Sequence, residues 1–220
     1  MDKFELVIGN KAYSSWSLRV WLALRHISVP FTEIRLAMDT PEFKSRVRKY
    51  SPTGKVPLLK HGDLTIWDSI AICEYLAERF PAARLWPDDT AARSVARCVS
   101  AEMHAGFPAI RKSMPFNCRA TGRHAPIPPE LEAEITRVAE IWRNCRQQYG
   151  QTGSWLFGRF SIADAMYIPV ALRFVTYGVN NLGRIEQAYV DTAQAYPAVQ
   201  EWIAAAKEEK EVIPTSEVGA

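Results

Sequence analysis

The chain has 220 residues, of which 48% are hydrophobic, and its formal net charge is +3. A chain of this length can bury a substantial core, as one large domain or as two small ones. No apolar stretch reaches the roughly 20 residues that span a bilayer, and the charged start is unlike a signal peptide, so we expect a cytoplasmic protein with no membrane partner. The basic runs lack interleaved aromatic residues and no nucleic-acid motif appears, which argues against nucleic acid as a partner.

The four cysteines and four histidines are scattered along the chain, with no CxxC pair and no cysteine close to a histidine. In a chain this long, widely spaced cysteines are typical of reduced thiols rather than of a disulfide or zinc framework. We therefore predict neither disulfides nor a metal site.

The first eighty residues alternate between strand and helix patterns. Short or alternating apolar runs predict strands, and apolar residues that recur three or four positions apart predict helices. In chain order the expected elements are a strand at 4–8, a helix at 16–27, a strand at 31–36, a short basic helix at 41–50 capped by Thr40, two hairpin strands around 61–63 and a helix at 68–80. This βαβαββα order predicts an α/β, thioredoxin-like domain in which helices cover a small mixed sheet.

The remainder of the chain has helical patterns only. Residues 81–89, PAARLWPDD, contain two prolines and no periodicity, which predicts a linker. We therefore expect a thioredoxin-like domain at 1–80, an all-helical domain at 90–210 and a frayed tail at 211–220. The expected helices lie at 90–112, 129–149 and 162–176, followed by one or two shorter ones, the last at 198–207.

Two local signals refine this helical half. Pro108 lies inside the helix expected at 90–112 and removes a backbone hydrogen bond, which predicts a bend near Phe107. Ser161 and Asp164 fit a capping box at the start of the helix expected at 162–176. The capping box bears on the fold and not on catalysis.

Two short segments of the first domain suit a peptide-like ligand. Pro57 opens an apolar strand, and a cis bond before it would leave the backbone N–H and C=O of Val56 free to pair with a ligand. Asp68 and Ser69 stand at the start of a helix, where N–H groups without partners attract anions. Together these elements would hold a ligand with an ammonium and two carboxylates, whereas Asp68 and Ser69 alone would indicate simple helix capping.

The segment SPTGKVPLLKHGDLTIWDSIAICEYL, residues 51–76, resembles the glutathione-binding half of the cytosolic glutathione transferases. The resemblance implies glutathione as co-substrate and no metal. It implies that the backbone of Val56, beside a cis Pro57, pairs with the cysteinyl part of glutathione. It also implies that Lys55 binds the glycyl carboxylate, Ser69 the γ-glutamyl carboxylate and Asp68 the ammonium.

The stretch YSSWSLR, residues 13–19, resembles the serine-type classes of this family, zeta, tau and theta, in which a serine polarises the glutathione sulfur. Alignment through Arg19 on the zeta and tau patterns implies Ser14 as the catalytic residue, and the theta pattern implies Ser15. Lowering a thiol pKa from about 8.5 by two units takes about 2.7 kcal/mol. One hydroxyl hydrogen bond to an anion supplies roughly 1.5–3 kcal/mol, so one serine is sufficient. One of the serines is also expected to cap the helix.

The second-substrate pocket is less well specified by the sequence. Trp16, His104, Phe107 and Arg111 stand where members of the family line that pocket, although such residues are as often part of a core. Zeta-class enzymes have a cysteine where this chain has Trp16, which argues against maleylacetoacetate isomerisation.

The resemblance thus implies a glutathione S-transferase that acts on a small electrophile, as in detoxification, and works as a homodimer. One alternative is a glutathione-dependent isomerase similar to maleylacetoacetate isomerase. The other is a non-catalytic protein of the same fold that binds a ligand or a protein partner.

Overall fold

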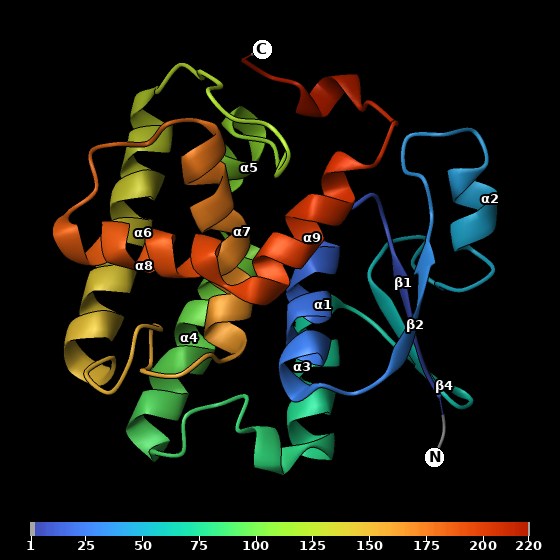
Figure 1. The fold of residues 1–220 in the computed structure, drawn as a ribbon, viewed down its shortest axis with the longest axis horizontal. Coiled ribbons are helices and arrows are strands. Elements are labelled where there is room, and N and C mark those ends of the chain that lie inside the picture. The colour runs from blue at the N-terminus through green and yellow to red at the C-terminus, as the bar shows by residue number, and fades with distance from the viewer. Residues whose placement is uncertain (1–2, 220) are drawn as a thin grey trace.

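The computed structural model describes residues 3–219, with a small β-sheet at one side of a larger helical body (Figure 1). The sheet belongs to a thioredoxin-like unit whose elements follow the predicted βαβαββα order. These elements are β1 (Phe4–Ile8), α1 (Ser15–Ile27), β2 (Phe31–Arg35), α2 (Phe43–Val47), β3 (Leu58–His61), β4 (Leu64–Ile66) and α3 (Ser69–Arg79).

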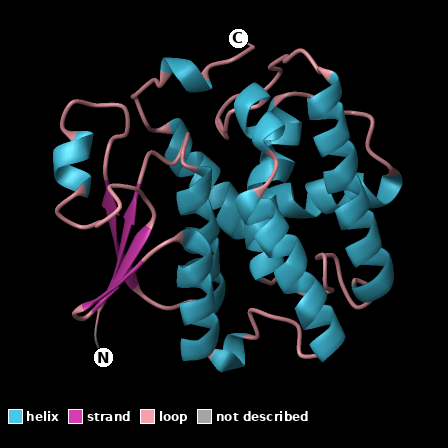
Figure 2. Cartoon of the chain, turned by 180° about the vertical axis from the view of Figure 1, so that it is seen from behind, coloured by secondary structure: helices cyan, strands magenta, loops and turns pink. Residues whose placement is uncertain are grey.

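The sheet has the strand order β2-β1-β3-β4, with β1 parallel to β2 and antiparallel to β3. Because side chains alternate along a strand, β1 contributes to two apolar layers. Leu6 and Ile8 enter the main core with α1 and α3, whereas Val7 packs with Val47 of α2 and with Leu58 of β3. Helices therefore cover both faces of the sheet, with α1 and α3 between it and the helical half (Figure 2).

The helical half consists of a bundle around α7. Its elements are α4 (Thr90–Ala105), α5 (Pro108–Ser113), α6 (Pro129–Tyr149), α7 (Ile162–Thr176), α8 (Arg184–Ala195) and α9 (Pro197–Lys207), with short 3-10 turns at Pro81–Ala83 and Pro214–Ser216. Helix α7 is apolar on nearly all sides and is buried accordingly between α1, α4 and α8. One continuous core joins the sheet to this bundle, so the division at 81–89 stays a prediction. No helix within residues 3–219 is long and apolar enough to cross a membrane.

Two predictions about helices need correction. Residues 90–112 do not form one bent helix, because α4 ends at Ala105 and the backbone of Phe107 is left-handed, with φ of 61°. Pro108 then starts α5, the helical position that a residue without an N–H tolerates best. The short basic helix is limited to Phe43–Val47, and the Thr40 hydroxyl donates to the carbonyl of Ala37 instead of capping it.

The C-terminal segment is not frayed over residues 208–217. The Glu209 carboxylate accepts hydrogen bonds from the N–H groups of Lys11 and Ala12, at 2.7 and 3.0 Å. The Glu217 carboxylate accepts from the Tyr13 hydroxyl at 2.6 Å and pairs with Arg123. The segment is therefore fastened to the loop that precedes α1.

Candidate active site

A cavity of about 650 Å³ lies where the loop before β3, the start of α3 and the end of α4 meet the start of α1. It brings together the predicted ligand-binding residues Lys55, Val56, Pro57, Asp68 and Ser69 with two residues predicted for the second-substrate pocket, Trp16 and His104. Two other hollows, of about 490 and 480 Å³, hold none of the predicted site residues. The cavity beside α3 is therefore the candidate site.

The Val56–Pro57 peptide bond is cis, as expected from the sequence. The turn that leads into it is ordered by Ser51, whose hydroxyl accepts a hydrogen bond from the Lys55 N–H at 3.3 Å. Within residues 3–219 no hydrogen bond occupies the N–H or the C=O of Val56. One wall of the cavity therefore offers a backbone donor and a backbone acceptor that can hydrogen-bond to a ligand.

Asp68 and Ser69 form the opposite wall, at the N-terminus of α3. One Asp68 oxygen caps the helix by accepting from the Ile70 N–H at 3.2 Å, and the other lies 3.1 Å from Nε2 of His104. The Ser69 side chain is fully buried, and its hydroxyl has no hydrogen-bond partner among the described residues. Because Ser69 also lines the cavity, its unpaired hydroxyl can hydrogen-bond to a polar ligand that binds there.

The second-substrate residues divide into two groups. Trp16 and His104 line the cavity, with their rings edge to face and 5.2 Å apart. Phe107 is buried away from the cavity, and Arg111 donates to the carbonyls of Met103 and Gly106. Arg111 therefore supports the break between α4 and α5, and it reaches the cavity only through the ring of Trp16, 4.8 Å from its guanidinium.

The two candidate catalytic serines are both buried, and neither lines the cavity. Ser14 caps α1, as expected for one of them, and its hydroxyl lies 2.7 Å from the hydroxyl of Ser17. The Ser15 hydroxyl instead accepts from the guanidinium of Arg173 at 3.3 Å. The choice between Ser14 and Ser15 stays a prediction.

Buried arginines give this end of α1 a positive environment. Arg19 stacks on Trp16, and burial, with Arg111 and Arg173 nearby, lowers the pKa of Arg19 to about 9. Burial, with Arg111 nearby, also lowers the pKa of Arg173 to about 9, so both remain protonated at neutral pH. Their field favours an anion such as a thiolate over the neutral thiol.

The sequence did not single out several residues that the cavity contains. Thr53, Gly54 and Trp67 lie beside predicted site residues within residues 51–76, so their position in the sequence could have indicated that they line the cavity. Met38 and Phe43 lie outside that segment and carry no motif. Arg173 was detectable only as the one charged residue that follows Asp164 in the largely apolar helix α7.

Comparison with known proteins places this arrangement in a family. Residues 13–79 match the family model described as glutathione S-transferase, N-terminal domain, and residues 128–205 match that of the C-terminal domain; together they span more than half of the chain. Maleylacetoacetate isomerase of Rattus norvegicus is 38% identical over 87 residues, 39% of this chain and 40% of that protein. Glutathione S-transferase 1 of Dianthus caryophyllus is 35% identical over 97 residues, 43% of this chain and 42% of that protein.

The matched segments thus span about two fifths of the length of these curated relatives. The fold extends further, since a glutathione transferase homologue from Burkholderia, solved with bound glutathione, superposes with a TM-score of 0.69 at 22% identity. That alignment covers 95% of this chain and 100% of the other. With both family models matched in order along one such fold, the chain belongs to the glutathione S-transferase family.

Proposed function

We propose that this protein is a glutathione transferase of the serine type, in which a serine hydroxyl activates the glutathione thiol for attack on a small electrophile. The observation that carries the proposal is the buried Ser69 hydroxyl without a partner, in the same cavity as the open backbone of Val56 and the carboxylate of Asp68. A non-catalytic scaffold of the same fold has no need to keep this set of groups together.

Each part of glutathione finds a complementary group in the cavity. The γ-glutamyl carboxylate would accept from the Ser69 hydroxyl and the N-terminal N–H groups of α3, where the helix dipole favours an anion. The γ-glutamyl ammonium would bind the Asp68 oxygen that now faces His104. The cysteinyl part would pair with the backbone of Val56, and the glycyl carboxylate would lie near Lys55.

The chemistry then needs only a thiolate and a nearby electrophile. Bound along Val56, the tripeptide would direct its sulfur toward the N-terminus of α1, where Ser14 and the buried arginines favour the anion. The thiol proton leaves to solvent and the sulfur forms a bond to the electrophilic atom of the second substrate; with an aryl halide, the carbon–halogen bond breaks and halide is released. The aromatic and apolar side chains of Trp16, Met38 and Phe43 would hold that substrate.

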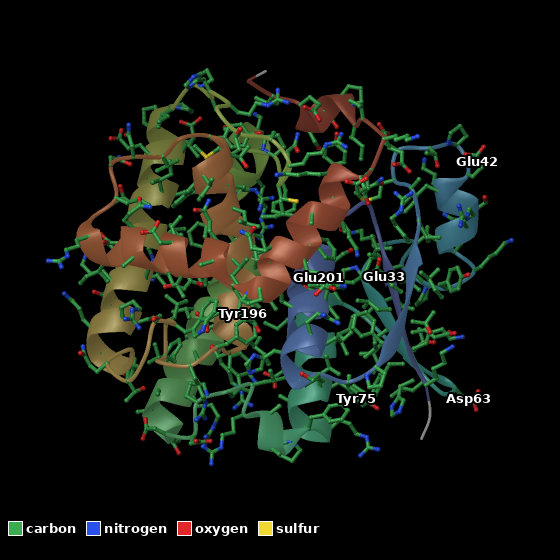
Figure 3. The ribbon with its side chains drawn as sticks, viewed as in Figure 1. Glu33, Glu42, Asp63, Tyr75, Tyr196 and Glu201 are labelled. Atoms are coloured by element: carbon green, nitrogen blue, oxygen red, sulfur yellow. The ribbon has the colours of Figure 1, made fainter. Side chains whose placement is uncertain are left out.

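Calorimetry with glutathione tests the binding site directly. Asp68→Ala is expected to weaken glutathione binding about tenfold, because a charge-assisted hydrogen bond is worth roughly 1.5–3 kcal/mol and Asp68 is about half exposed. Asp63→Ala is the matched control, since Asp63 lies in the turn between β3 and β4, at the end of the sheet and outside the cavity (Figure 3). A dissociation constant that Asp68→Ala leaves unchanged would refute the role of Asp68.

Ser69→Ala offers a second test of the same site. The substitution removes a buried hydroxyl that has no partner among the described residues, so it is expected to leave the stability of the unliganded protein unchanged or slightly higher. Glutathione binding should nevertheless weaken by about tenfold or more. Thermal unfolding with and without glutathione separates the effect on stability from the effect on binding. If Ser69→Ala lowers the unfolding temperature equally in both conditions, Ser69 has no role in binding the ligand.

A glutathione-dependent isomerase is the second candidate, and the similarity to the rat maleylacetoacetate isomerase favours it. Trp16 argues against it, because this large side chain lines the cavity at the position where zeta-class enzymes have a cysteine. Turnover of small unsaturated dicarboxylic acids in the presence of glutathione, compared with turnover of an aryl halide, distinguishes the two activities. A homodimer and a cytoplasmic location, both typical of the family, stay predictions.

A further inference from the structure

Ser17 lies one helical turn after Ser14 and has no access to solvent. Its hydroxyl oxygen accepts a hydrogen bond from the N–H of Gly9 at 3.2 Å and lies 2.7 Å from the hydroxyl oxygen of Ser14. Gly9 directly follows β1, and a side chain at this position would collide with Met38, so the loop backbone lies close against its neighbours. Ser17 is thus held in place by the end of the central strand.

The hydroxyl groups of Ser14 and Ser17 have a limited number of protons and lone pairs. A serine hydroxyl has one proton to donate and two lone pairs. The Gly9 N–H occupies one lone pair of Ser17, and within residues 3–219 the only other hydrogen-bond partner of that hydroxyl is Ser14. Ser14 already accepts from the N–H of Ser17 at 3.4 Å. When Ser17 donates to Ser14, the Ser14 proton has no acceptor among these groups and remains available to an external anion.

We propose that Ser17 is a positioning residue for thiol activation: it donates its hydroxyl proton to Ser14 and thereby directs the Ser14 proton to the glutathione sulfur. The inference rests on the proposed function and on Ser14 as the thiol partner. The reverse order, Ser14 donating to Ser17, is open to the unliganded protein, but a thiolate selects the order in which Ser14 donates outward. A hydroxyl that accepts one hydrogen bond is also a stronger donor in the next, so the pair stabilises the anion more than Ser14 alone.

The alternative is that Ser17 only fastens α1 to the end of β1. In that case its loss lowers stability, because the Gly9 N–H is left unpaired, but the ionisation of bound glutathione does not change. The pKa of the bound thiol, measured by the ultraviolet absorbance of the thiolate during a pH titration, separates the two roles.

The experiment compares the wild type with Ser17→Ala, Ser17→Thr and Ser17→Val. Threonine keeps the hydroxyl of serine, and valine has nearly the same shape as threonine but lacks the hydroxyl. In Ser17→Ala and Ser17→Val the pKa of bound glutathione is expected to rise by about 0.5 to 1 unit, so that activity below this pKa falls about three- to tenfold. Ser17→Thr should retain the wild-type pKa. Ser100→Ala, which removes another fully buried serine hydroxyl, in α4, should leave the pKa unchanged.

The outcomes are distinct. A wild-type pKa in Ser17→Ala, or in Ser17→Val if the alanine variant does not fold, overturns this inference and leaves the proposed function intact. Equal pKa shifts in the threonine and valine variants also overturn it, since packing rather than the hydroxyl would then be responsible. A wild-type protein that binds no glutathione overturns the proposed function and this inference with it.

Discussion

Ser14→Ala is expected to lower turnover of an aryl halide roughly 30-fold at neutral pH while leaving glutathione affinity nearly intact. If the hydroxyl lowers the thiol pKa from about 8.5 to about 6.5, its loss reduces the thiolate from roughly three quarters of the bound glutathione to a few per cent. The affinity is preserved because the proposed binding groups lie on α3 and before β3 rather than on α1. Steady-state kinetics should therefore show a lower kcat with little change in the KM for glutathione.

Ser15→Ala is the matched comparison, because Ser15 is equally buried but its hydroxyl contacts Arg173. A large loss of turnover in Ser15→Ala with little loss in Ser14→Ala would move the thiol-activating role to Ser15. Ser14 also caps α1, so Ser14→Ala should cost about 1 kcal/mol of stability. Turnover is therefore compared at a temperature at which both variants are folded.

That the residues proposed to bind glutathione share one cavity could be predicted, because they are close in the sequence. Val56, Pro57, Asp68 and Ser69 lie on either side of one short hairpin, and the geometry of a hairpin and a helix start is set by local residues. The cavity indeed contains all four. By contrast, Arg173 reaches Ser15 only after α7 has packed against α1, and no periodicity in the sequence reports such a contact.

The helices and the end of the chain show the same contrast: features set by neighbouring residues could be predicted, and features set by distant contacts could not. Those predicted at 129–149 and 162–176 agree with α6 and α7 to the residue, since a proline and a capping box mark their starts. The end of the chain was wrongly expected to be frayed. Its order comes from pairs such as Glu217 with Tyr13, about two hundred residues apart, and helical patterning contains no information on such pairs.

Asp164→Ala is expected to cause the largest loss of stability, about 3–5 kcal/mol. Asp164 is fully buried at the start of α7 and accepts from the N–H of Leu156 at 3.0 Å. It also accepts from the N–H and the hydroxyl of Ser161, at 2.8 and 2.9 Å, which confirms the aspartate side of the predicted capping box. Alanine would leave these donors unpaired in the core, whereas Asp89→Ala, which removes the single cap of α4, should cost about 1 kcal/mol.

The pH dependence of the stability lost in Asp164→Ala tests the burial of this carboxyl group. Burial raises the pKa of Asp164 from 3.8 to about 6, although its hydrogen bonds oppose the shift. The folded state therefore binds the Asp164 proton more tightly than the unfolded state does, and the stability that this proton contributes is complete below about pH 4 and lost as the pH rises through about 6. The difference in unfolding free energy between the wild type and Asp164→Ala should shrink across that interval and stay constant above it. Urea unfolding at several pH values measures this difference. A difference that grows from pH 4 to pH 6 would contradict a pKa raised by burial, because it would mean that the hydrogen bonds to the carboxylate outweigh its desolvation.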